Sequence, residues 1–268
     1  MRRIGSIALA ALLIAAMGTT ATAAQKTLKA GSGTPTIDGK IDDAYKAAEA
    51  ISINVVTSGD KKTTGTAYCL WDANNIYVLF DVTDPHISPA PNGKLDNNQA
   101  YYADSVEFFM DLTGTTNADI TKVDAGQYTA QAAIPGADFS IWNGRGGHQE
   151  ANKANAKYTS VKTDKGYITE MQIPWGSKYT PKANAEILVA FHINSDEDGK
   201  DGRDGEIFGN EGQSNAWSDS KAYDKLVLTE EVYKAPVKAP ATADAGIIAA
   251  LAALASTGAA ALSLKKRK

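Results

Sequence analysis

The chain has 268 residues, and its 27 basic and 31 acidic side chains give a formal net charge of −4. Six of the basic residues lie before residue 25 or after Asp244, so residues 25–244 carry a net charge of −10. That acidic balance argues against a surface that follows nucleic-acid phosphates. The single cysteine, Cys69, excludes an intramolecular disulfide and a multi-cysteine zinc site.

Residues 1–24 have the order of a secretory signal peptide. Two arginines are followed by an apolar stretch over 7–17 and by the small residues of 21–24. Such segments are removed on export, and we expect cleavage after Ala23 or Ala24. The sequence therefore predicts a protein that works outside the cytoplasm.

Residues 25–231 are predicted to form one all-β domain. Aromatic and β-branched residues fill 66–72 and 76–82, and the intervening Ala73-Asn74-Asn75 is typical of a hairpin turn. We expect one short helix near 42–50. Further strands are expected at 105–112, 127–133, 138–142, 156–163, 167–173, 186–194 and 223–228. Short strands separated by turn residues indicate an antiparallel β-sandwich of the jelly-roll type.

The chain after residue 231 is predicted to be a membrane tether. A linker with Pro236 and Pro240 spans 232–244, and the next 20 residues, 245–264, carry no charge. At 1.5 Å per residue a helix of that length spans about 30 Å, the thickness of a bilayer core. The basic residues 265–268 are expected to stay in the cytoplasm. We therefore expect an exported protein held at the cell surface.

This arrangement of linker, apolar segment and basic tail resembles the cell-wall sorting signals of Gram-positive surface proteins. Those signals carry the pentapeptide Leu-Pro-any-Thr-Gly, and this chain has Ala-Pro-Ala-Thr-Ala at 239–243. The second and fourth positions agree, whereas the first and last do not. Retention in the membrane is accordingly the expectation, with attachment to the wall as an open alternative.

Enzyme motifs are absent from the sequence. The three histidines show no HExxH or similar pairing, and no GxSxG motif occurs. The glycine run 144–147 is expected to lack the strand-to-helix setting of a phosphate-binding loop. A pair of carboxylates for glycoside hydrolysis stays open, because 31 acids offer many pairs.

A Gly-rich acidic loop, 196–206, is a candidate calcium site. Flexible loops with several carboxylates provide the oxygen ligands that Ca²⁺ prefers outside the cell. We expect Asp196, Asp198 and Asp201 to be ligands, and a solvated acidic turn is the alternative. The spacing does not match an EF-hand.

Five segments carry a family resemblance. They are TIDGKIDDAY at 36–45, LWD with IYVLF at 70–80, DSVEFFMD at 104–111, the strand ending in IPW at 173–175, and FHIN at 191–194 with the acidic loop and WSD at 217–219. Together they resemble the family 9 carbohydrate-binding modules, over residues 29–228. The resemblance implies a β-sandwich that binds sugar chain ends between two aromatic rings, with structural calcium.

The resemblance also implies a set of site residues. The two rings fall on Tyr101 and Trp217, and the hydrogen-bonding groups fall on Glu107, Arg203 and Asn215. Where the family carries a second arginine this chain has Thr129, which predicts fewer charged donors and weaker or altered sugar binding. The polar surroundings of Trp217 favour contact with a ligand, with closure over the core as the alternative, whereas Trp71 and Trp175 are expected in the core.

We therefore expect a non-catalytic module that holds plant or microbial oligosaccharide or polysaccharide near the cell, alongside secreted or surface glycoside hydrolases. One alternative is a heme-binding domain of related sandwich type, with Met110 or His192 as axial ligand. Another is an accessory or adhesion protein associated with glycoside hydrolases.

Overall fold

The computed structural model describes residues 25–59, 62–88, 100–132, 142–200 and 202–235, and the described residues up to Tyr233 form the folded domain. The expected signal peptide, the apolar segment 245–264, most of the linker and the basic tail lie outside the described residues. Within the described ranges no helix is long and apolar enough to cross a membrane.

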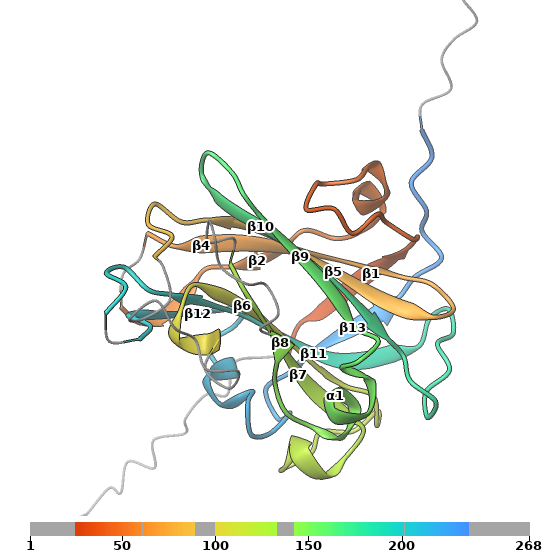
Figure 1. Cartoon of the computed structure of the whole chain (residues 1–268). Coiled ribbons are helices and arrows are strands. Elements are labelled where there is room, and N and C mark those ends of the chain that lie inside the picture. The colour runs from red at the N-terminus through yellow and green to blue at the C-terminus, as the bar shows by residue number, and fades with distance from the viewer. Residues whose placement is uncertain (1–24, 60–61, 89–99, 133–141, 201, 236–268) are drawn as a thin grey trace, which may run out of the picture. The chain divides into compact units, whose positions relative to one another are not determined.

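The domain consists of two β-sheets, sheet A and sheet B, and has little helix (Figure 1). Sheet A contains β3 (Val55–Ser58), β6 (Ser105–Asp111), β7 (Ala125–Gln131), β8 (Trp142–Asn143), β11 (Glu186–Ser195), β12 (Gly205–Phe208) and β13 (Asp224–Leu228). Sheet B contains β2 (Ile51–Ile53), β4 (Thr64–Trp71), β5 (Asn75–Thr83), β9 (Lys157–Lys162) and β10 (Gly166–Pro174).

Strand β1 (Thr27–Ser32) joins the two sheets. Its first four residues pair with β13, and Gly31 and Ser32 pair with β4. Both pairings are parallel, so the expectation of a purely antiparallel sandwich is wrong at this strand. Parallel partners need a long connection rather than a hairpin, and almost the whole domain lies between β1 and β13.

The helical elements are short. The expected helix near 42–50 is the 3₁₀ helix η1 (Asp43–Ala47), and the longest helix in the described part of the chain is α1 (Gly147–Asn152). The other 3₁₀ turns in the described ranges, η3 (Ala100–Tyr102), η4 (Ile120–Lys122) and η5 (Gln213–Asn215), precede or connect strands of sheet A. The expected hairpin is formed by β4 and β5, with Trp71 opposite Ile76. The expected strand 138–142 falls outside the described residues except at its last position.

The main core lies between the sheets and follows from the alternation of side chains along each strand. On β6, Phe108 and Met110 face this core, and Phe191 on β11 packs against Phe108 and against Phe80 of sheet B, with ring centroids 5.5 and 6.1 Å apart. Trp175 belongs to the same core with 2% of its surface exposed, as expected. Trp71 is only partly buried, with its indole N–H donating to the Thr229 carbonyl.

The two outer faces differ. On sheet B, η1 covers the strands through a small cluster that contains Tyr45, Leu70 and Leu79. On sheet A, a second cluster around Phe109 and Tyr223 is covered by the segments that follow β6 and β12. Beyond this cluster the outward-facing residues of β6, β7 and β11 are polar, and they form the floor of a cavity.

Candidate functional site

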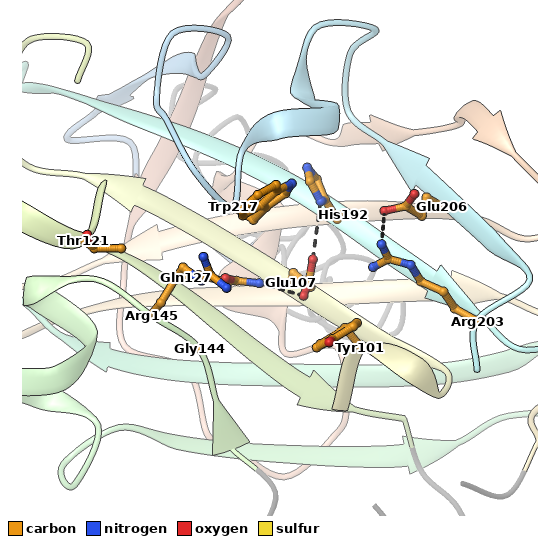
Figure 2. Close-up of a pocket in the computed structure, with 10 residues that line it drawn as sticks. All are labelled: Tyr101, Glu107, Thr121, Gln127, Gly144, Arg145, His192, Arg203, Glu206 and Trp217. Carbon is orange, nitrogen blue, oxygen red and sulfur yellow. Dashed lines mark hydrogen bonds and ion pairs between the residues drawn. The ribbon is translucent and has the colours of Figure 1, made fainter. Parts of the chain in front are cut away.

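A cavity of about 550 Å³ lies on the outer face of sheet A (Figure 2). Its floor consists of side chains from three neighbouring strands, Glu107 on β6, Gln127 on β7 and His192 on β11. Its walls come from the connecting segments and from β12, with Tyr101, Thr121, Gly144, Arg145, Arg203, Glu206 and Trp217.

Glu107 is the centre of the floor, because it is directly opposite His192 on one side and Thr129 on the other. Its Oε1 accepts hydrogen bonds from the Gln127 amide at 2.9 Å and from the Thr129 hydroxyl at 3.0 Å. Its Oε2 lies 3.4 Å from Nδ1 of His192. Burial alone would raise the pKa of Glu107, but the contacts with His192 and the positive charge of Arg203 outweigh it and hold the pKa below its usual value.

His192 is held by two aromatic rings. Its imidazole lies 4.5 Å from the Phe109 ring and 4.3 Å from the Phe208 ring, between centroids. Nδ1 faces Glu107, and Nε2 is buried without a hydrogen-bond partner among the described residues. Met110, the other residue of the heme hypothesis, points into the core on the opposite face of sheet A. The two alternative axial ligands of the heme hypothesis therefore lie on opposite faces of sheet A.

Two aromatic side chains flank the floor. Trp217 follows η5 and leaves 47% of its surface exposed, so it does not close over the core. The backbone before it is fixed because the Tyr223 hydroxyl donates to the Ala216 carbonyl at 2.7 Å. Tyr101 belongs to η3, and Figure 2 shows it and Trp217 on opposite sides of Glu107. Tyr102 packs beside Tyr101, with ring centroids 4.5 Å apart, and does not line the cavity.

Arg203 is held by two partners next to Tyr101. Its Nη2 lies 2.6 Å from Oε1 of Glu206, and its Nη1 donates to Oδ1 of Asn194 at 2.9 Å. Its guanidinium lies 5.4 Å from the centroid of the Tyr101 ring, within the range of a cation–π contact.

The structure thus brings four of the five expected sugar-site residues into one cavity, namely Tyr101, Glu107, Arg203 and Trp217. Asn215 does not line it. This residue is exposed at the end of η5, and its backbone carbonyl accepts from the backbone N–H groups of Ser218 and Asp219.

Sequence reasoning missed Arg145 as a residue of the cavity. The loop that carries it lies between β8 and α1, so the strand-to-helix setting that we expected to be absent is present. With Arg203 and Arg145 the cavity holds two guanidinium groups, whereas Thr129 had suggested fewer charged donors.

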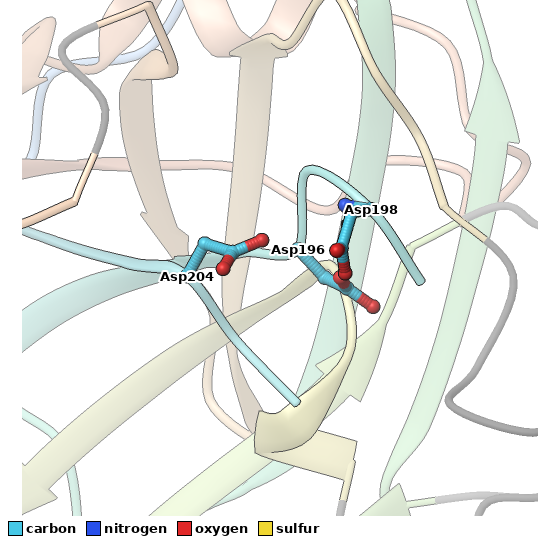
Figure 3. Close-up of side chains that lie close together, drawn as sticks. All are labelled: Asp196, Asp198 and Asp204. Atoms are coloured by element: carbon cyan, nitrogen blue, oxygen red, sulfur yellow. Dashed lines mark hydrogen bonds between the residues drawn. The ribbon is translucent and has the colours of Figure 1, made fainter. Parts of the chain in front are cut away.

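The acidic loop brings three carboxylates together (Figure 3). Oxygens of Asp196, Asp198 and Asp204 lie within 4.8 Å of one another. Two of these are residues of the expected calcium site, and Asp204 is an addition to it. Asp201, the third expected ligand, lies outside the described residues.

A buried carboxylate group lies directly beside this loop. Asp104 accepts hydrogen bonds from the backbone N–H groups of Ser88 and Asp196, at 2.7 and 2.8 Å. Burial and the neighbouring charge of Asp84 raise the pKa of Asp104 to about 9. Asp84 Oδ2, Asp196 Oδ2 and Glu197 Oε1 are buried without hydrogen-bond partners in the described chain. Unpartnered buried oxygens of this kind fit a hard cation such as Ca²⁺.

Comparison with known proteins identifies the family. The sequence model of the family described as "Carbohydrate family 9 binding domain-like" matches residues 37–231. This chain belongs to that family. The family 9 domain is 34% identical over 198 residues to the endo-1,4-beta-xylanase A of Thermoanaerobacterium saccharolyticum, and 33% identical to the exoglucanase XynX of Acetivibrio thermocellus. Each match covers 74% of this chain but only 16% of the relative.

Solved structures agree on the fold. A family 9 carbohydrate-binding module from Caldicellulosiruptor kristjanssonii in complex with cellotriose superposes with a TM-score of 0.61 at 21% identity, and covers 80% of this chain and 100% of that one. The same kind of module in complex with glucose gives a TM-score of 0.60 at 20% identity. The all-β, sandwich-like fold expected from the sequence is confirmed.

Proposed function

We propose that this family 9 domain binds the end of a glycan chain in the cavity on sheet A. The observation that carries the proposal is the pair of aromatic rings, Tyr101 and Trp217, on either side of the buried carboxylate of Glu107. A sugar ring has apolar faces, which aromatic rings cover, and hydroxyls at its edge, which charged groups bind. Because the solved modules bind glucose and cellotriose, a glucose-type chain end is the first candidate.

The cavity supports binding rather than catalysis. Among the described residues that line it, the carboxylates are Glu107 and Glu206. A glycosidase needs a carboxylic acid with a raised pKa to protonate the leaving group, whereas the pKa of Glu107 is lowered. Glu206 is paired with Arg203. We therefore propose that hydrolysis is carried out by separate glycoside hydrolases, and that this domain keeps the glycan near the cell.

Calorimetry with glucose, cellobiose and cellotriose tests the proposal on the purified full chain. A site for glycan ends should bind all three sugars with one site per protein molecule. The affinities should level off after one or two sugar units. Affinity that continues to increase with the length of the oligosaccharide would instead indicate binding along the glycan and not at its end. A glycan array in which no plant, bacterial or host glycan binds above background would contradict the proposal altogether.

We also propose that the domain is exported and tethered through residues 245–264. The uncharged stretch of 20 residues before a tetrabasic segment supports this proposal. Deletion of residues 244–268 should release the protein into the medium. A truncated protein that stays with the cells at the original level would show that something else attaches it.

Calcium is proposed as a structural ion at the buried carboxylate group beside the acidic loop. Asp84, Asp104, Asp196 and Glu197 would hold it, because three of their oxygens are buried without partners in the described chain. When bound, the ion would compensate the negative charges of these neighbouring buried carboxylates, which have no cationic partner among themselves.

A further inference from the structure

Among the described residues, only some of the charged side chains in the cavity have a partner of opposite charge. Arg203 is paired with Glu206 at 2.6 Å. Glu107 accepts two hydrogen bonds and faces His192. Arg145 is the one cavity-lining cation for which the described part of the chain provides no carboxylate partner, and Figure 2 draws no contact from it to another lining residue.

The backbone of Arg145 is fixed on sheet A. Its carbonyl accepts a hydrogen bond from the Gln127 N–H at 2.8 Å. The glycines on either side allow this close approach, because a Cβ at Gly144 would lie 1.8 Å from the Gln127 carbonyl oxygen and one at Gly146 would lie 2.3 Å from that of Ala125. Both glycines also have positive φ angles, 153° and 110°, which other residues rarely adopt. The loop therefore holds its one arginine in a defined place at the rim.

The guanidinium of Arg145 lies beside the Trp217 ring. It is 5.2 Å from the centroid of the Trp217 ring. Burial and the neighbouring Tyr102 raise the pKa of Tyr101, and the positive charges of Arg203 and Arg145 both oppose that rise. Arg145 is thus close enough to influence the Tyr101 hydroxyl as well. The 5.2 Å distance to Trp217 is within the range of a cation–π contact, and a sugar placed against Trp217 would have beside it a guanidinium that has no carboxylate partner among the described residues.

We propose that the cavity prefers a chain end that carries a carboxylate, a uronic acid, over the corresponding neutral sugar, and that Arg145 binds this carboxylate. The inference rests on the proposed sugar-binding function and specifies its ligand. A guanidinium is planar and matches a carboxylate with two parallel hydrogen bonds. Since residues 25–244 carry a net charge of −10, the preference must come from contact with Arg145 and not from attraction by the domain as a whole.

The test compares sugars that differ only at C6. Glucose and glucuronic acid, and cellobiose and its C6-oxidised uronic acid, are titrated into the full chain at low and at high salt. Arg145 is exposed. Because an exposed ion pair contributes modestly, we expect about a three- to fivefold preference for the uronic acid at low salt, decreasing at high salt as the charges are screened. Arg145→Gln should bring the affinity ratio to about one, and Arg145→Lys, which keeps the charge without the planar fork, should retain part of it.

Lys153→Gln is the matched control. It also removes one positive charge, but Lys153 is paired with Glu150 at the end of α1 and does not line the cavity. This variant should keep the wild-type ratio, and thermal melting should show that all variants are folded. Equal or tighter binding of the neutral sugars by the wild type, or an Arg145→Gln variant that keeps the preference, would overturn the inference alone. Absence of binding to both members of each pair would overturn the inference, and an empty glycan array would overturn the proposed function with it.

Discussion

Glu107 and His192 face each other across neighbouring strands, with Oε2 of the carboxylate 3.4 Å from Nδ1 of the imidazole. Both side chains are almost fully buried at the floor of the cavity. A buried carboxylate is tolerated only when hydrogen bonds or charges compensate its lost hydration. Glu107 has such partners on both oxygens, so it is a fixed acceptor around which a ligand can be oriented.

Glu107→Gln should weaken sugar binding by about 1.5 to 3 kcal/mol, because hydrogen bonds to a charged acceptor are stronger than those to a neutral one. It should also change the pH dependence of stability. Because the pKa of Glu107 is lower in the folded state, its stabilising effect is present above the usual value of 4.5 and is lost as the pH falls through the folded-state pKa.

Denaturant unfolding of the wild type and of Glu107→Gln from pH 7 to pH 3 measures this effect. The difference in unfolding free energy should be constant above about pH 5 and should shrink below it. A difference that stays the same over the whole range would show that the ionised form of Glu107 is not the one that stabilises the fold.

Calcium should stabilise the domain. An ion bound only by the folded state adds about 2.7 kcal/mol when its concentration is a hundredfold above Kd, and EDTA should reverse the gain. Asp104→Asn should abolish the response because the buried Asp104 carboxylate interacts with both Asp84 and Asp196. Glu186→Gln is the control, since Glu186 is paired with Lys225 on the surface. Melting curves that are unchanged by both EDTA and Ca²⁺ would remove calcium from the description of this domain.

The sequence predicted most of the strands because their apolar and β-branched residues recur where two sheets cover them. It missed β1 and β12, which have little local signal and are fixed by distant partners, and it missed the short strands β2 and β3 although residues 51–57 are rich in β-branched side chains. Strand β12 begins inside the acidic loop, where the Gly- and Asp-rich sequence indicates a turn and not a strand. Pairings such as Glu206 with Ser58 bring together residues far apart in the chain, and no local pattern specifies them.

The residues of the candidate site also fall into two groups, those predicted from sequence motifs and those placed there by the fold. Tyr101, Glu107 and Trp217 were reached through motifs of the family. Arg145 and the buried Asp84 were missed, because their role comes from where the fold places a loop or a strand end. Tyr101 lines the cavity and its neighbour Tyr102 does not, and both lie in the 3₁₀ turn η3, whose local geometry the sequence motif does not specify.

The first family motif, 36–45, has a structural role that a stability measurement can test. The buried carboxylate of Glu170 on β10 accepts from the backbone N–H groups of Asp38 and Gly39, and from the Tyr45 hydroxyl at 3.1 Å. Tyr45→Phe removes one donor from this carboxylate and should lower the unfolding free energy by about 1 to 2 kcal/mol.

Tyr68→Phe is the matched control, because the Tyr68 ring lies 6.4 Å from that of Tyr45 and its hydroxyl has no hydrogen bond among the described residues. It should cost less than about 0.5 kcal/mol. Sugar affinity should be unchanged in both variants, since this cluster covers the outer face of sheet B and the cavity lies on sheet A. Equal destabilisation by the two substitutions would show that ring packing, and not the bond to Glu170, holds the motif in place.

Trp217 should contribute to sugar binding through stacking. Stacking a sugar on the indole buries about 60 Å² of apolar surface, worth about 1.5 kcal/mol, so Trp217→Ala should raise Kd at least about tenfold. The ring is 47% exposed, so the same substitution should change the melting temperature little.

Trp175→Ala should have the opposite profile, because Trp175 is buried and its indole N–H donates to the Asp72 carbonyl at 2.9 Å. We expect it to destabilise the fold by about 3 to 5 kcal/mol while the folded fraction keeps its affinity. Calorimetry combined with thermal melting separates the two effects, and a folded Trp217→Ala variant with Kd within twofold of the wild type would exclude Trp217 as the stacking platform.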